Sequence, residues 1–172
     1  AGVCSRREAE RWITDGRVTM DGEVLKTPAV KVTAANKIKV DGKPLPQAET
    51  TRLWRYHKPT GLLTTHKDTD GRPTVFQSLP DTLPRLISVG RLDLNSEGLL
   101  LLTNDGELAR KLELPATAWR RRYRVRVHGR IHADALFPLE NGLNIAGIKY
   151  GPIKASLERQ QGANAWLSVS LT

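Results

Sequence analysis

The first fifty residues show the pattern of one helix followed by short strands. Ser5 can cap a helix over 6–15, and Glu8 would complete a capping box because it lies three positions later. Gly16 comes directly after this segment and would end the helix. The N-terminal part of the chain is therefore expected to open with a short capped helix.

Short alternating segments follow the predicted helix. We predict strands at residues 17–20, 23–25 and 37–40. The Asp-Gly pairs at 21–22 and 41–42 are typical of tight hairpin turns. Pro44, Pro46 and the polar stretch 47–51 then indicate a linker.

From residue 52 onward, the pattern is that of many short strands with a few helical segments. Strands are predicted at 53–59, 86–89, 99–102, 122–128, 143–145, 153–158 and 166–171. Helical segments are predicted at 74–79, 107–114 and 133–140. Asp105 would cap the second helical segment, and Pro115 would end it. The four leucines 99–102 form an uncharged run, which we expect to be buried.

These elements predict an α+β protein with two domains. The first would be a small helix-plus-hairpin domain at 1–46, joined by the linker 47–51 to a larger domain at 52–172. The larger domain mixes short strands, glycine turns and two or three helices, which is typical of a mainly antiparallel mixed sheet.

Composition narrows the class of protein further. Of the 172 residues, 39% are hydrophobic and 26% charged, which fits a folded globular chain rather than a disordered one. The single cysteine, Cys4, excludes an internal disulfide framework and fits a reducing compartment. No apolar run is long enough to cross a bilayer, and the start does not resemble a signal peptide. We therefore expect a cytoplasmic protein that does not bind membranes.

The net charge of +9 is concentrated in the last third of the chain. Residues 115–172 contain nine Lys and Arg and three Asp and Glu, and nine minus three gives +6. Within this part, residues 122–128 alternate, with Tyr123 on one face and Arg122 and Arg124 on the other. A strongly basic protein favours a polyanion, because cations that neutralise phosphates release condensed counterions. Nucleic acid is the expected partner.

One segment, residues 89–106, carries the most specific chemistry. Its sequence is VGRLDLNSEGLLLLTNDG, in which Arg91 and Asp93 come before the leucine run and a tight turn. This segment resembles the active-site motif of the pseudouridine synthases, in particular the bacterial branch that modifies ribosomal RNA with one catalytic aspartate. The resemblance implies that Asp93 is the essential carboxylate and that Arg91 helps to fill the space left by a flipped nucleotide. The alternative is that Asp93 caps a turn and pairs with Arg91.

Two further segments resemble the same family. The tyrosine of a Y-x-V strand, here Tyr123, is implied to pack against the target base, although it could instead be a half-buried strand residue. The segment YHKPTGLLTT at 56–65 is implied to shape the wall of the cleft, with Lys58 near a phosphate. Arg121, Arg122 and Arg124 would face RNA, unless they only form a solvated strand edge that discourages aggregation.

The N-terminal segment CSRREAERWITDGRVTMDGEVLKTPAVKV resembles the RNA-binding domain named after ribosomal small-subunit protein four. In that domain a helix and a hairpin present basic residues to structured RNA. The candidates carried over here are Ser5, Arg6, Arg7, Arg11, Arg17 and Lys26. A solvated helix face is the alternative. Members of these families have a further helix before this segment and a basic motif after the last strand, so we expect the chain to be a fragment.

The function implied by these resemblances is the isomerisation of a specific uridine to pseudouridine in ribosomal RNA, with large-subunit RNA favoured. The reaction detaches uracil from its ribose, turns it and rejoins it through carbon, and it needs no metal or other cofactor. The target nucleotide must leave its stack. We expect a monomer whose partner is ribosomal RNA. The competing hypothesis is a non-catalytic RNA-binding or ribosome-associated protein that retains the scaffold.

Overall fold

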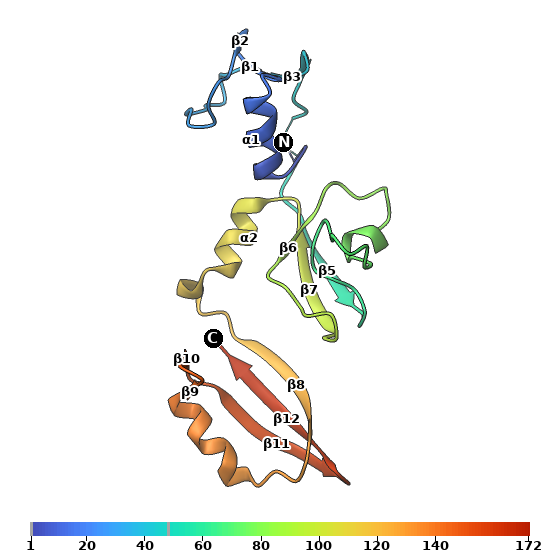
Figure 1. The fold of residues 1–172 in the computed structure, drawn as a ribbon, viewed down its shortest axis with the longest axis vertical. Coiled ribbons are helices and arrows are strands. Elements are labelled where there is room, and N and C mark those ends of the chain that lie inside the picture. Colours follow the sequence, from blue (N-terminus) through green and yellow to red (C-terminus); the bar gives the residue numbers. More distant parts are fainter. Residues whose placement is uncertain (1, 48) are drawn as a thin grey trace. The chain divides into compact units, whose positions relative to one another are not determined.

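The computed structural model describes residues 2–47 and 49–172 (Figure 1). Ala1, in the predicted domain 1–46, and Ala48, in the predicted linker 47–51, lie outside the described residues. The chain divides into two compact units, Ala1–Glu113 and Leu114–Thr172. This division falls inside the predicted domain 52–172, and the predicted domain boundaries stay predictions.

The N-terminal part of the first unit contains the expected helix and hairpins. Helix α1 (Arg6–Thr14) begins after Ser5, whose Oγ accepts a hydrogen bond from the Glu8 amide at 3.2 Å, which confirms the predicted N-cap. A four-stranded sheet follows in the order β2-β1-β3-β4. Its strands are β1 (Val18–Met20), β2 (Glu23–Val24), β3 (Ile38–Val40) and β4 (Lys43–Pro44). The Asp-Gly turns adopt positive φ at both positions, as tight hairpins of this kind require.

A second sheet in this unit carries the leucine run. Its strands are β5 (Leu53–Lys58), β6 (Ile87–Val89) and β7 (Gly98–Thr103), in the antiparallel order β5-β7-β6. Leu100 and Leu102 on β7 lie opposite Tyr56 and Trp54 on β5. These four side chains belong to or pack against the core, which is centred on Val75, Leu86, Leu100 and Leu102.

The expectation that the whole leucine run is buried is wrong for Leu99. Its side chain is 66% exposed, whereas Leu100 and Leu102 are buried. The physical reason is the two-residue period of a strand, which turns Leu99 and Leu101 to the face away from the core. Helix α2 (Gly106–Glu113) contacts β6 and β7, and Leu101 is half-buried.

Helix α2 is positioned by the turn that follows the leucine run. Asp105 Oδ1 accepts hydrogen bonds from the amides of Glu107 (2.8 Å) and Leu108 (3.2 Å), which confirms the predicted cap. Asp105 Oδ2 accepts a further bond from the hydroxyl of Thr51 at 2.6 Å. The helix ends before Pro115, as predicted, and a 3-10 turn η2 (Pro115–Thr117) follows. The predicted helical segment at 74–79 is a 3-10 turn, η1 (Phe76–Ser78).

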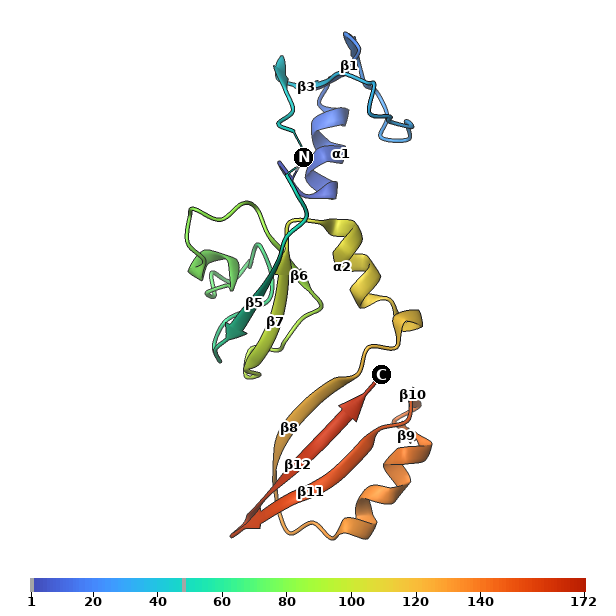
Figure 2. The same cartoon turned by 180° about the vertical axis from the view of Figure 1, so that it is seen from behind.

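The second unit is built on a three-stranded antiparallel sheet in the order β11-β12-β8. The strands are β8 (Arg121–His128), β11 (Lys154–Gln161) and β12 (Asn164–Leu171). A 3-10 helix η3 (Ala133–Asn141) lies along β11, as Figures 1 and 2 show. It contains Pro138, which lacks the amide proton that an α-helix needs there. A short hairpin, β9 (Leu143–Ile145) with β10 (Ile148–Tyr150), completes the unit, and β10 was not predicted.

The three larger sheets and the β9-β10 hairpin are antiparallel throughout the described residues, apart from one isolated parallel bridge between Leu63 and Thr74. Helices and strands occur in both units, so the predicted α+β class with a mainly antiparallel sheet is confirmed. No helix in the described part of the chain is long and apolar enough to cross a membrane.

Candidate active site

Asp93 lies on the loop 90–97 that joins β6 to β7. Its side chain and that of Arg91 are both exposed. Within residues 2–47 and 49–172, no ion pair joins the two, and the hydrogen bonds of Asp93 use its backbone carbonyl. Among these residues the Asp93 carboxylate is thus exposed to solvent without an ion-pair partner, which suits a group that must meet an incoming ligand.

Lys58, the last residue of β5, holds the backbone of this loop by hydrogen bonds. Its Nζ donates to the carbonyl oxygens of Pro59 (3.0 Å), Asp93 (3.0 Å) and Ser96 (2.8 Å), and it approaches that of Leu94 at 3.5 Å. Hydrogen bonds from an ammonium are among the stronger ones in proteins. A single side chain from another strand therefore bonds the backbone of the loop at both Asp93 and Ser96.

The structure corrects the expected role of Lys58. Its side chain is fully buried, with 0% exposure, so it lies beneath the Asp93 loop rather than against a phosphate. Burial lowers the pKa of Lys58 from its usual value, while the negative charge of Asp93 acts in the opposite direction. The signal was present in the sequence, because the two-residue period of β5 places Lys58 on the same face as Trp54 and Tyr56.

The rest of the segment 56–65 also contacts the Asp93 loop. The amide of Gly61 donates to the carbonyl of Leu94 at 2.8 Å, and Gly61 has a φ of 85°, a conformation that other residues rarely adopt. The hydroxyl of Thr64 donates to the carbonyl of Leu92 at 2.8 Å and accepts from its amide at 3.3 Å. The two motifs, far apart in sequence, therefore form one hydrogen-bonded unit.

The start of the loop is fixed separately. Gly90 has a φ of 72°, and its amide donates to Glu113 Oε1, at the end of α2, at 2.6 Å. With its start bonded to α2 and its middle bonded to Lys58, Gly61 and Thr64, the loop holds its backbone while the side chains of Arg91 and Asp93 stay exposed. Such preorganisation is what a reacting carboxylate requires.

A polar loop at 65–73 follows Thr64 and is internally paired. Asp68 accepts hydrogen bonds from the Arg72 guanidinium at 2.8 and 3.2 Å and from the Arg72 amide at 2.9 Å. These contacts lower the pKa of Asp68 to about 2. His66 stacks on Phe76, with ring centroids 3.7 Å apart. These contacts give the loop that follows Thr64 a fixed conformation.

Tyr123 belongs to the second unit, on β8 opposite Val169. Its side chain is 36% exposed, which leaves an aromatic surface accessible. Arg121 shares the Tyr123 face of the sheet by alternation, whereas Arg122 and Arg124 lie on the opposite face. The three arginines grouped in the sequence are therefore divided between two surfaces, a separation that the alternation of the strand itself predicts.

The N-terminal candidates fall into two groups. Exposed cations are found at Arg6, Arg7, Arg11 and Lys26, and Arg6 also pairs with Glu10 at 3.5 Å. The other two already have structural partners. The Ser5 hydroxyl caps α1, and the Arg17 guanidinium binds both carboxylate oxygens of Asp41. This ion pair lowers the pKa of Asp41, chiefly through the hydrogen bond from Arg17.

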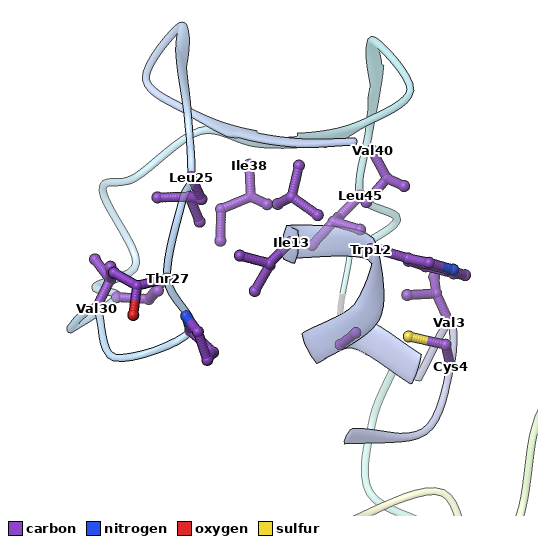
Figure 3. A pocket seen from close by; sticks show the side chains of 14 residues that line it. Val3, Cys4, Trp12, Ile13, Leu25, Thr27, Val30, Ile38, Val40 and Leu45 are labelled. Carbon is purple, nitrogen blue, oxygen red and sulfur yellow. The ribbon is translucent and has the colours of Figure 1, made fainter. Parts of the chain in front are cut away.

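An apolar pocket also lies in the N-terminal part, between α1 and the small sheet (Figure 3). Its walls include Trp12, Ile13, Leu25 and Ile38, and Thr27 is one of its few polar residues. A uracil or ribose needs several hydrogen-bonding partners, which this lining does not offer. We therefore regard the pocket as the open side of a small hydrophobic core.

Comparisons with known proteins agree with these observations. Residues 52–168 match the family described as RNA pseudouridylate synthase, and residues 1–38 match the S4 domain. An uncharacterized RNA pseudouridine synthase of Rickettsia felis is 49% identical over 172 residues, covering 99% of this chain and 74% of that protein. Ribosomal large subunit pseudouridine synthase B of Escherichia coli O157:H7 is 41% identical over 178 residues, covering 100% of this chain and 61% of that protein.

A solved structure shows the same likeness. A pseudouridylate synthase crystal structure aligns with a TM-score of 0.60 and 26% sequence identity, covering 96% of this chain and 71% of the other. The matched family spans most of the chain, and the similarity to the Rickettsia felis protein covers 99% of this chain. The chain belongs to the RNA pseudouridylate synthase family and carries an S4 domain at its N-terminus.

Proposed function

We propose that this protein converts a uridine of large-subunit ribosomal RNA into pseudouridine, with Asp93 as the reacting carboxylate. Two relatives support the choice of RNA, because the Yersinia pestis and E. coli proteins, 43% and 41% identical, are both named ribosomal large subunit pseudouridine synthase B. The observation that carries the assignment of Asp93 is its exposed side chain on a loop whose backbone is bonded at 92, 93, 94 and 96.

The reaction breaks the bond between C1′ of the ribose and N1 of uracil and forms a bond between C1′ and C5. The proton on C5 is lost and one is gained at N1, so the nucleotide keeps its mass. A carboxylate can attack or stabilise the sugar or the base while the two are apart. Asp93 suits this role because hydrogen bonds from Lys58 to the carbonyls of Asp93 and Ser96 hold the backbone of its loop.

Other residues are proposed to bind and place the RNA. Arg91, exposed two positions before Asp93, would fill the space left by the everted nucleotide, and Tyr123 would stack on its base. Contacts to the RNA backbone would come from Arg6, Arg7, Arg11, Lys26, Arg121, Arg122 and Arg124. Lys58 is placed with the positioning residues instead, because it is buried.

Replacing Asp93 with Asn tests the proposal. Pseudouridines would be mapped in ribosomal RNA from cells that lack the gene and from cells complemented with either protein. We expect one or more sites to disappear without the gene, to return with the unchanged protein and to stay absent with Asp93→Asn. RNA affinity of the variant should stay within a few fold of the original.

Glu97→Gln provides the matched control, because Glu97 is an exposed acid on the same loop. It removes the same charge and should leave the product yield unchanged. Full product with Asp93→Asn would contradict the assignment and favour the second hypothesis, a non-catalytic protein that binds RNA through the same scaffold. That the protein is found in the cytoplasm, where ribosomes are assembled, stays a prediction. That it is a monomer also stays a prediction.

A further inference from the structure

The face of the β11-β12-β8 sheet that lies opposite Tyr123 is basic. Cross-strand register places Arg122, Arg124 and Arg126 of β8 opposite Ser170, Ser168 and Trp166 of β12. On the other side of β12, Lys154 lies opposite Ser170 and Arg159 opposite Trp166. Side-chain contacts support this assignment, because Arg124 lies 4.5 Å from the centre of the Trp166 ring and donates to Glu158 of β11 at 2.8 Å. We call this surface the basic face, made of Arg122, Arg124, Arg126, Lys154, Glu158, Arg159 and Trp166.

The charge of the basic face favours a polyanion. Five cations and one carboxylate give it a net charge of five minus one, or +4. The side chains of all five cations are exposed, so they are accessible to phosphates. Such a cluster raises the local affinity for nucleic acid and makes binding depend strongly on salt.

An aromatic residue, Trp166, lies among these cations. Trp166 is half-buried and has Arg126 on one neighbouring strand and Arg159 on the other. The Arg124 guanidinium stacks on its ring, which presents two planar groups together. Proteins that bind single-stranded RNA stack its bases on aromatic side chains and contact its phosphates with cations, and an exposed sheet with a tryptophan and several arginines offers both.

This surface cannot serve the same nucleotide as Tyr123. Alternation along β8 directs Tyr123 to one face of the sheet and Arg122, Arg124 and Arg126 to the other. A base stacked on Tyr123 would therefore have the sheet between itself and the basic face. Nucleotides bound on the basic face are therefore different from the one stacked on Tyr123.

We propose that the basic face binds a second, single-stranded segment of the RNA whose uridine is modified, with one base stacked on the Arg124–Trp166 pair. The identity of that RNA rests on the function proposed above. Such a contact would add affinity far from the reacting nucleotide and would help to select the target from other exposed uridines.

The test compares the double variant Arg122→Gln/Arg126→Gln with Arg110→Gln/Lys149→Gln, which removes two exposed cations elsewhere. Binding of the full chain to an unmodified large-subunit ribosomal RNA transcript is measured at several salt concentrations. We expect the first variant to lower the slope of log K against log salt by about 1.4, or 0.7 for each lost single-strand phosphate contact. The control should leave the slope unchanged. Equal slopes in the two variants would overturn the proposal.

Trp166 is tested separately, with Trp166→Phe and Trp166→Leu. Loss of one stacked base should weaken binding by about 5- to 150-fold in the leucine variant. The phenylalanine variant keeps a stacking ring and should stay within about threefold, whereas equal affinity of both variants would contradict stacking. If the leucine variant fails to fold, the arginine pair and the phenylalanine variant still decide.

Turnover separates this proposal from the one on which it rests. The Arg122→Gln/Arg126→Gln variant should raise KM and leave kcat within about twofold, since it removes binding and not chemistry. An unchanged KM, with the original protein still forming pseudouridine, would refute the basic face alone. Absence of product from the original protein would refute the proposed function, while the salt slopes would still report on the face.

Discussion

Replacing Lys58 with Met should disable the Asp93 loop while keeping the shape of the buried stem. Methionine fills a similar volume, so the change mainly removes the ammonium and its bonds to the carbonyls of Pro59, Asp93 and Ser96, at 2.8–3.0 Å. Methionine has no hydrogen-bond donor, so these three carbonyls lose the bond that Lys58 makes to each of them.

The magnitude follows from two opposing effects. Three hydrogen bonds from a charged donor contribute about 1.5–3 kcal/mol each. Burying the ammonium costs several kcal/mol, which the variant no longer has to bear. The variant is therefore expected to lower the free energy of unfolding by about 1–4 kcal/mol. For a chain of this size, that corresponds to a fall in Tm of about 2–16 °C. A loop displacement of about 1 Å would lower kcat by about 100-fold.

The assay measures pseudouridine formation on a large-subunit ribosomal RNA transcript together with the melting temperature. Lys67→Met is the matched control, because Lys67 is exposed on the neighbouring loop. It should keep both kcat and Tm. If Lys58→Met kept kcat within threefold and Tm within about 2 °C, the buried ammonium would not position Asp93. A fall in Tm with unchanged kcat would assign Lys58 to stability alone.

Three other changes test neighbouring contacts. Asp105→Ala removes the acceptor for two amides of α2 and for Thr51, and should lower the free energy of unfolding by about 1–2 kcal/mol in a urea titration. Gly61→Ala forces a methyl group onto a residue with a φ of 85° and should cost about 1–2 kcal/mol while lowering kcat; an unchanged kcat would show that the Gly61–Leu94 bond is dispensable. Asp68 has a pKa of about 2 in the fold against 3.8 normally, so its stabilising effect is complete above about pH 4 and is lost as pH falls toward 2. The difference in Tm between the original protein and Asp68→Asn should shrink over that interval, and a difference independent of pH would contradict the assigned ion pair.

Local signals in the sequence predicted much of this structure. The Ser5 and Asp105 caps were recoverable because each depends on a side chain within a few residues of the amide that it binds. The hairpin of β9 and β10 was missed for a physical reason. Its turn uses Ala146 and Gly147, both with positive φ, and alanine rarely adopts that conformation. A rule based on Asp-Gly or Asn-Gly pairs could not detect it.

Lys58 shows a different limit. The family resemblance of the segment 56–65 implied a phosphate contact for Lys58, which would require an exposed side chain. The alternation along β5 instead predicts that the Lys58 side chain faces the core, and in the structure this side chain is buried. What the sequence could not supply was the set of acceptors that makes burial of this charge tolerable, because the carbonyls of Asp93 and Ser96 come from another part of the chain.

The spacing of the two motifs is explained by the register of β5 and β7. Lys58 lies directly opposite Gly98, the residue at which the Asp93 loop returns to the sheet. That pairing places the Lys58 side chain at the open end of the loop, where the carbonyls of residues 93 and 96 converge. A slip of one residue would turn Lys58 to the other face of the sheet and leave these carbonyls without a donor. The geometry around Asp93 therefore depends on the hydrophobic residues that fix the register, Trp54 and Tyr56 against Leu102 and Leu100, as much as on the polar residues of the loop.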